Sequence, residues 1–185
     1  MSKKTIYIII AVVIVILLYV WGGYNGLVTT NLAADTQWSQ VETQYQRRFD
    51  LIPNLVESVK GVMKQEQAIF TALADARTKY SGSTSADAKA QAAGQVETAL
   101  GRLLAVVENY PTLKSSENVQ TLMSQLEGTE NRISVERKRF NETVMAYNLK
   151  VKTFPSSLLA KTFGFADRAL FDAVSGSEVA PKVSL

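Results

Sequence analysis

The sequence of 185 residues contains no cysteine and no histidine, and only four prolines. Without cysteine the chain has no disulfide, no thiol nucleophile, no cysteine for lipid attachment and no sulfur ligand for a metal. Without histidine it lacks the commonest general base and a frequent zinc ligand. A glycine-rich phosphate loop and a metal-binding motif are missing as well. We therefore expect a protein that is not an enzyme and has no metal or cofactor.

An excess of one charge is also missing. The chain has 20 basic and 17 acidic residues, with a formal net charge of +3. This balance is too even to favour nucleic acid as a partner. Charged residues make up 20% and apolar residues 46% of the sequence, as in an ordinary folded protein. Once some 30 residues are assigned to an anchor, the remaining length suits one folded domain.

The N-terminal region contains a long apolar run. Every residue from Ile6 to Trp21 is apolar or aromatic, and no charged residue occurs from Thr5 to Ala34. About 20 such residues cross the hydrocarbon core of a bilayer, and only a helix can do so alone. Residues 1–34 are therefore predicted to hold the N-terminus, a transmembrane helix and an exit segment. A cleaved signal peptide is the alternative, but no small-residue cleavage pair follows the run closely.

Aromatic residues flank this run, as they do at both interfaces of a membrane span. The predicted interfacial residues are Tyr7, Tyr19, Trp21 and Tyr24. Lys3 and Lys4 precede the span, whereas the next basic residue after it is Arg47. The positive-inside rule then predicts a single-pass protein with its N-terminus in the cytoplasm and its domain on the outer face.

Gly22 and Gly26 form a G-x-x-x-G spacing at the end of the span. This spacing allows two membrane helices to approach closely, so both glycines are candidate oligomer contacts. The alternative is that they provide a flexible exit from the bilayer.

Apolar residues then recur in steps of three and four along three segments, as in amphipathic helices. The first stripe runs from Trp38 to Tyr80 and stays in phase across Pro53, which predicts a kink or short break at the proline. The second runs from Ala92 to Tyr110, and the third from Val119 to Phe154.

The three stripes predict an all-α fold in which a transmembrane helix precedes an antiparallel bundle of three long helices. A short fourth helix is expected to begin at Ser156 or Ser157 and to end at Gly164. The bundle domain spans 35–163, and 164–185 is predicted to be a packing segment followed by an extended tail.

Four charged residues occupy positions where the stripes should be apolar. They are Arg48, Glu66, Glu130 and Arg137. Because an unpaired charge in a bundle core is costly, these residues predict an internal ion network, in which Arg137 bridges to an acid near Glu66 and Glu130. The alternative is that some of them face outward and recognise a partner.

The first and third stripes are longer than the second, so part of each should lack an intramolecular cover. This predicts subunit contacts at the ends of the stripes, with Trp38, Tyr45, Tyr147 and Phe154 as candidates, and hence a homo-oligomer. The C-terminal residues Val183, Ser184 and Leu185 could dock in a groove of a partner. A frayed terminus is the simpler interpretation of the same residues.

Several ordered motifs match a known family. They are Tyr24-Asn25-Gly26-Leu27-Val28, Trp38-Ser39-Gln40-Val41, the continuous stretch Arg47–Lys60, Tyr110–Lys114, Thr129–Ile133, Arg137 with Phe140-Asn141, Tyr147-Asn148, Phe154-Pro155 and Pro181–Leu185. Over nearly its full length the chain resembles the LemA family. The family usually ends in Phe where this chain has Leu185.

The resemblance implies a bacterial helical bundle anchored in the inner (plasma) membrane, with no catalytic residues to carry over. It also suggests that a membrane protease or another envelope protein is a partner. We therefore expect a membrane-anchored scaffold or adaptor of the bacterial envelope that self-associates. The alternative is a sensor that transmits a ligand or stress signal through the bundle and the Pro53 region.

Overall fold

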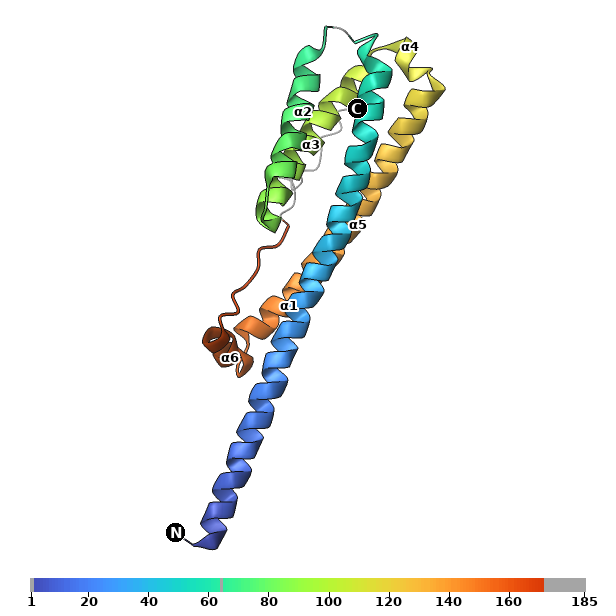
Figure 1. Ribbon diagram of the computed structural model, residues 1–185. Helices are drawn as coiled ribbons and strands as arrows, with labels where there is room; N and C mark the ends of the chain where they lie inside the picture. The colour runs from blue at the N-terminus through green and yellow to red at the C-terminus, as the bar shows by residue number, and fades with distance from the viewer. Residues whose placement is uncertain (1, 64, 172–185) are drawn as a thin grey trace, which may run out of the picture. The chain divides into compact units, whose positions relative to one another are not determined.

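The computed structural model describes residues 2–63 and 65–171, which form six helices and no strand. This confirms the prediction of an all-helical chain. The helices are α1 (Lys3–Lys60), α2 (Gln67–Gly82), α3 (Ala86–Val107), α4 (Pro111–Lys114), α5 (Glu117–Lys152) and α6 (Ser156–Phe163) (Figure 1). The predicted docking residues Val183, Ser184 and Leu185 lie outside the described residues.

The described chain divides into two compact units. Unit 1 contains residues 2–37 and 139–171, and unit 2 contains the described residues of 38–138. Both α1 and α5 contribute to each unit, because the divisions fall inside these two helices. Each unit is described by itself below.

The helix α1 has 58 residues and continues through Pro53, where a kink or break was expected. It ends instead at Lys60, next to Gly61, which is a weak helix former. The break changes the helical phase, so that Val62 of the predicted stripe is 47% exposed and Met63 is fully buried. The single element predicted up to Tyr80 is therefore two helices, α1 and α2.

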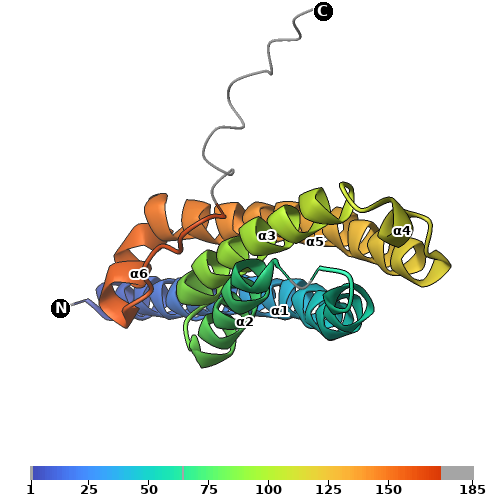
Figure 2. The same ribbon diagram turned by 90° about the horizontal axis from the view of Figure 1, so that it is seen from above.

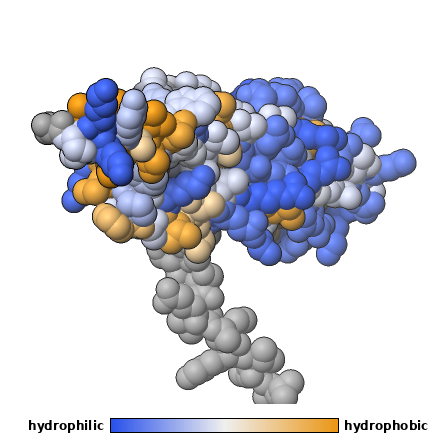
Figure 3. Space-filling model, turned by 90° about the horizontal axis from the view of Figure 1, so that it is seen from below, coloured by the Kyte–Doolittle hydropathy of each residue, from blue (hydrophilic) through white to orange (hydrophobic). Residues whose placement is uncertain are grey.

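The N-terminal part of α1 fits a membrane anchor. Within α1 an 18-residue window reaches a mean hydropathy of 2.7, and none of that window is buried inside the protein. Figure 3 shows hydrophobic side chains gathered around the N-terminal end of α1. In water such a surface would be strongly unfavourable, whereas in hydrocarbon it needs no protein cover.

In unit 2, α2 and α3 pack against each other and lie side by side in both ribbon views (Figures 1 and 2). Ser85 caps α3, because its hydroxyl accepts a hydrogen bond of 3.2 Å from the backbone N–H of Ala88. The short helix α4 was not predicted. It begins with Pro111, and proline suits the first position of a helix because the backbone N–H that it lacks would have no partner there.

In unit 1, α6 has the bounds that its sequence predicted. Gly164 ends the helix in the left-handed conformation, with φ of 76°, which glycine adopts without steric cost. Leu159 and Ala160 of α6 are buried against Leu27 of α1. These contacts attach α6 to the part of α1 that follows the apolar run.

Candidate functional site

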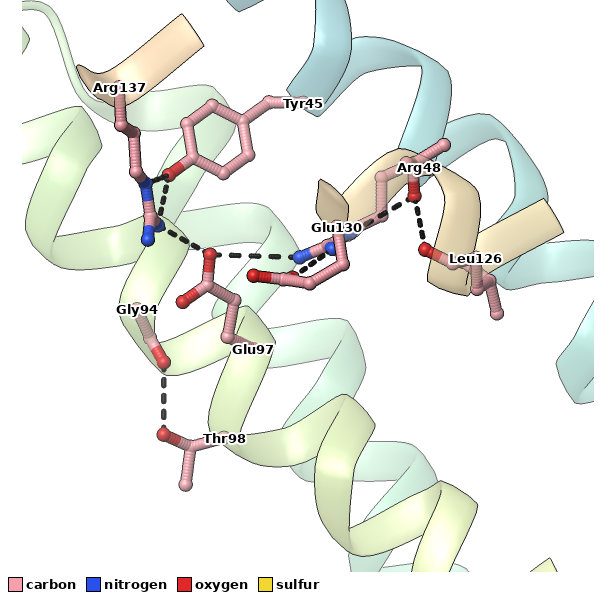
Figure 4. A network of polar contacts seen from close by, with 9 residues as sticks. Tyr45, Arg48, Gly94, Glu97, Thr98, Leu126, Glu130 and Arg137 are labelled. Atoms are coloured by element: carbon pink, nitrogen blue, oxygen red, sulfur yellow. Dashed lines mark hydrogen bonds and ion pairs between the residues drawn. The ribbon is translucent and has the colours of Figure 1, made fainter. Parts of the chain in front are cut away.

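The centre of unit 2 contains a buried arginine. Arg48 lies on the apolar stripe of α1 and is only 2% exposed. Its guanidinium forms an ion pair with Glu130 of α5 and lies 3.6 Å from the carboxylate of Glu97 on α3. Its Nε also donates a hydrogen bond of 3.4 Å to the hydroxyl of Thr129. Figure 4 shows how one cation on α1 thereby joins side chains of α3 and α5.

A second arginine also contacts the carboxylate of Glu97. Arg137 of α5 forms an ion pair with Glu97, and its Nε donates a hydrogen bond of 2.9 Å to the hydroxyl of Tyr45. The guanidinium carbon also lies 5.5 Å from the centre of the Tyr45 ring. Glu97 thus connects Arg48 with Arg137 (Figure 4). We call these five residues, Tyr45, Arg48, Glu97, Glu130 and Arg137, the polar cluster.

Burial governs the titration of the polar cluster. Burial raises the pKa of Tyr45 to about 12, although Arg137 opposes the shift. Burial also raises the pKa of Glu97 above its ordinary value, with Arg137 and Arg48 opposing. For Arg137, burial alone would lower the pKa, but Tyr45 and Glu97 outweigh it and raise the pKa. Tyr45 is therefore neutral at physiological pH.

The predicted ion network is only partly assembled in this way. Arg48, Glu130 and Arg137 come together, whereas Glu66 precedes α2 as its N-cap residue and makes no side-chain capping bond. Arg137 pairs with Glu97, an acid that shares Arg48 with Glu130. Glu97 was overlooked because only its position next to Val96, on the apolar stripe of α3, distinguished it from surface carboxylates.

A cavity of about 640 Å³ adjoins the polar cluster within unit 2. Its apolar walls include Leu100, Leu104 and Met123. Four carboxylates and two basic groups also line it, namely Glu97, Glu108, Glu127, Glu130, Arg48 and Lys114. This size and this mixture of apolar walls with a few polar groups suit a small molecule. The excess of carboxylates favours a neutral or cationic ligand over an anion.

In unit 1 two asparagines of α5 hold the segment that follows α6. The side chain of Asn148 donates to the carbonyl of Arg168 at 2.8 Å and accepts from its N–H at 2.9 Å. Asn141 makes the same two bonds with Phe171, at 3.1 and 2.8 Å. Seven helical residues rise about 10.5 Å, and three extended residues span about 10 Å, so the two spacings match.

Further contacts reinforce this arrangement. The hydroxyl of Tyr147 donates a hydrogen bond of 2.8 Å to the carbonyl of Ala166, and Arg168 forms an ion pair with Asp35 of α1. We call residues 165–171 the strap. Both asparagines belong to motifs through which the sequence resembles a family, and the strap gives those motifs a structural role.

The predicted oligomer contacts differ widely in exposure. Tyr45 is fully buried and Tyr147 is 2% exposed, so the prediction that they contact another subunit is wrong for these two side chains. Each tyrosine packs instead within its own chain, because its hydroxyl finds a partner there. Trp38 is half-buried, and Phe154 is 80% exposed.

The predicted contact glycines and interfacial aromatic residues all lie in unit 1. Gly22 has open space around it, and Gly26 accepts a hydrogen bond of 3.2 Å from Lys150 through its carbonyl. The four predicted interfacial aromatics are all exposed on the surface, namely Tyr7, Tyr19, Trp21 and Tyr24. Tyr24 also packs edge-on against Phe163, with ring centres 5.0 Å apart.

Comparison with known proteins places the chain in one family. The model of the LemA family matches residues 37–185. The magnetosome protein MamQ of Magnetospirillum gryphiswaldense is 31% identical over an alignment of 168 positions, and the match covers 77% of this chain. The magnetosome protein MamQ 1 of Paramagnetospirillum magneticum is 30% identical over the same share of the chain. The match spans 62% of the length of each of these curated relatives. With its matched region and its helical structure, this chain belongs to the LemA family.

Proposed function

We propose that this protein is a membrane-anchored, non-catalytic scaffold or adaptor of the bacterial envelope, and that it acts by associating with copies of itself. The N-terminal part of α1 anchors it in the inner membrane, with the N-terminus in the cytoplasm. The helices that follow the anchor form an antiparallel bundle on the outer face. An envelope protein such as a membrane protease is the proposed further partner.

The observation that carries self-association is an apolar surface in unit 1. Met145 and Leu149 are 59% and 63% exposed, and they lie one turn apart on the same face of α5. Large apolar side chains that gather on an exposed helix face mark a protein interface more often than isolated ones do. Because all anchors insert into the membrane from the same side, two copies would run parallel and could bring these faces together.

Light scattering of the detergent-extracted full chain tests this proposal. We expect a mass that is a multiple of the 20.3 kDa chain, after subtraction of the detergent. The double variant Met145→Glu, Leu149→Glu should lower that mass to one chain, because carboxylates cannot be buried in an apolar contact without a partner. Val135→Glu is the matched control, since Val135 is also exposed on α5 but lies in unit 2. A strict monomer of the unaltered chain would contradict self-association.

The cavity beside the polar cluster favours a second candidate function, a sensor of a small apolar ligand. A ligand in this cavity would contact α1, α3 and α5 together, because Arg48, Glu97 and Glu130 all line it. It could therefore change how these helices pack in unit 2.

The neutral dye Nile red can test whether the cavity takes an apolar ligand. A Cβ added at Gly101 meets no neighbour, so Gly101→Leu should fill the cavity without strain and abolish the fluorescence of bound dye. Gly94→Leu is the control, because Gly94 has equal space on the same helix but does not line this cavity. Equal dye binding by both variants would exclude the cavity as the binding site.

A further inference from the structure

The turn between α5 and α6 and the first turn of α6 each expose a large apolar side chain. Phe154 is 80% exposed and Leu158, four residues later, is 59% exposed. The fold of unit 1 thus leaves both side chains without a cover of their own, and we call them the turn surface.

The contacts between α6 and α1 show at which level of α1 the turn surface lies. Leu159 of α6 packs against Gly23, so closely that a Cβ on the glycine would collide with it. Val20, inside the apolar run, packs against the same buried cluster. Gly23 is two residues beyond Trp21, which is about 3 Å along the helix axis. The turn surface therefore lies at the start of a helix that meets α1 at the level where the predicted membrane span ends.

An aromatic contact gives the same level independently. The ring of Tyr24 lies 5.0 Å from that of Phe163 and 5.8 Å from that of Phe165. Tyrosine and tryptophan concentrate in the headgroup layer of a membrane, which is roughly 5 to 8 Å thick on each side. Two phenylalanines that touch an interfacial tyrosine fall within this layer.

The charges of the segment complement a lipid surface. Lys150, Lys152 and Lys161 lie within residues 150–163, and this stretch contains no acidic residue. Lys152 also pairs with Asp167 at 3.1 Å, and Lys150 donates to the carbonyl of Gly26, whereas Lys161 belongs to α6 itself. Lysines beside exposed apolar side chains are the usual composition of a helix that lies in the plane of a membrane, where they attract anionic headgroups. A protein partner would not require the surface to sit at the end of the span.

From the level of α6 along α1, the exposure of the turn surface and the charge of the segment, we propose that α6 and the preceding turn lie in the headgroup layer of the membrane. Phe154 and Leu158 then insert toward the acyl chains, and the lysines contact anionic phosphates. The inference rests on the proposed anchoring by α1. It adds a second lipid contact, which would hold unit 1 at a defined depth and tilt instead of on a free tether.

Single-cysteine labelling can test this in the full chain, because the natural sequence has no cysteine to remove. Phe154→Cys and Leu158→Cys would each carry a nitroxide, in vesicles of phosphatidylethanolamine and phosphatidylglycerol. Oxygen concentrates in the bilayer, whereas a charged nickel chelate stays in water, so the ratio of their collision rates with the label reports its depth. We expect a ratio at both positions that is several-fold above that of Glu142→Cys, an exposed position on α5.

Leu17→Cys, within the apolar run, separates the two levels of the proposal. If the label at Leu17 is in lipid and those at Phe154 and Leu158 match Glu142, the inference about α6 is overturned and the anchor stands. If the label at Leu17 is also in water, the anchoring itself fails. Spin–spin broadening at Phe154 would show that a second copy covers the turn surface, and would overturn the inference as well.

The lysines provide a second readout. In the labelled Leu158→Cys chain, Lys161→Glu should reduce the depth of the label in vesicles that contain phosphatidylglycerol. Lys138→Glu, on α5 outside residues 150–163, is the control and should leave the depth unchanged. Equal depth in all three chains would contradict the role of anionic headgroups.

Discussion

The guanidinium of Arg137 donates a hydrogen bond of 2.9 Å to the hydroxyl of Tyr45, a residue 92 positions earlier in the chain. The same guanidinium pairs with Glu97, so a single side chain of α5 contacts both α1 and α3. Tyr45 is fully buried, and its hydroxyl would otherwise lack a donor in the interior of unit 2. The polar cluster therefore specifies which helices meet and in what register.

Loss of Arg137 should expose this coupling in a double-mutant cycle. We expect Arg137→Met and Tyr45→Phe to destabilise the protein together by less than the sum of their separate effects, with a coupling of about 0.5 to 3 kcal/mol. The free energy of unfolding of the full chain in detergent, followed by near-ultraviolet circular dichroism, measures it. Strictly additive effects would mean that the hydrogen bond contributes nothing to folding.

Arg48 should matter more than its neighbour in sequence. Arg48→Met removes a buried cation and leaves Glu130 without its partner, although Glu97 keeps Arg137 and the side chain of Glu130 is half-exposed. We therefore expect a loss of about 1 to 3 kcal/mol, below the cost of a fully uncompensated charge. Arg47→Met, at an exposed position, should change stability by less than about 0.5 kcal/mol. Equal losses would remove the distinction between the two arginines.

The pKa of Glu97 predicts how stability depends on pH. Since burial raises this pKa above 4.5 in the folded protein, folding favours the protonated carboxyl. The resulting stability is fully present below pH 4.5 and is lost as the pH rises through the folded-state pKa. Relative to Glu97→Gln, which does not titrate, the unaltered chain should lose stability as the pH rises. A relative gain would show that Arg137 and Arg48 outweigh burial.

The asparagines should control access to the strap. Asn148→Ala removes two hydrogen bonds to the backbone of Arg168, each worth about 1 kcal/mol. The strap should then open more often, and trypsin should cut after Arg168 roughly ten-fold faster or more. Asn131→Ala, at an exposed position on α5, is the matched control and should leave this rate unchanged. Unaltered cleavage in Asn148→Ala would show that the two bonds do not limit opening.

Two adjacent glycines should respond differently to a side chain. Gly23→Val would push against Leu159, whereas Gly22→Val meets open space. We expect faster amide hydrogen exchange in α6 for Gly23→Val alone, measured by mass spectrometry of the full chain in detergent. The second change Leu159→Ala should partly restore protection by making room. If both glycine variants exchange alike, α6 does not depend on this contact.

The helical class, the N-terminal apolar helix and the bounds of α6 could be predicted from the sequence because each rests on local chemistry. A long apolar run indicates a segment that lies in hydrocarbon, and apolar residues in steps of three and four indicate a helix. A glycine such as Gly164 indicates where a helix ends. The break at Gly61 was harder to predict, since Pro53 is the stronger breaker by local rules. Ile52 and Leu55 beside it are buried, and their packing supports a continuous helix there.

The partners of the charged residues depended on tertiary structure. Periodicity showed that Arg48 and Arg137 lie on apolar seams and so need opposite charges, but it contained no information on which carboxylate of another helix would reach them. Glu97 has that place because packing sets α3 at the right height and rotation. In the same way, the sequence alone determined that this protein has an apolar helix and several amphipathic helices. Only the tertiary structure decided which large aromatic side chains are buried, such as Tyr45, and which are exposed, such as Phe154. Burial is a property of distant neighbours, which no local pattern records.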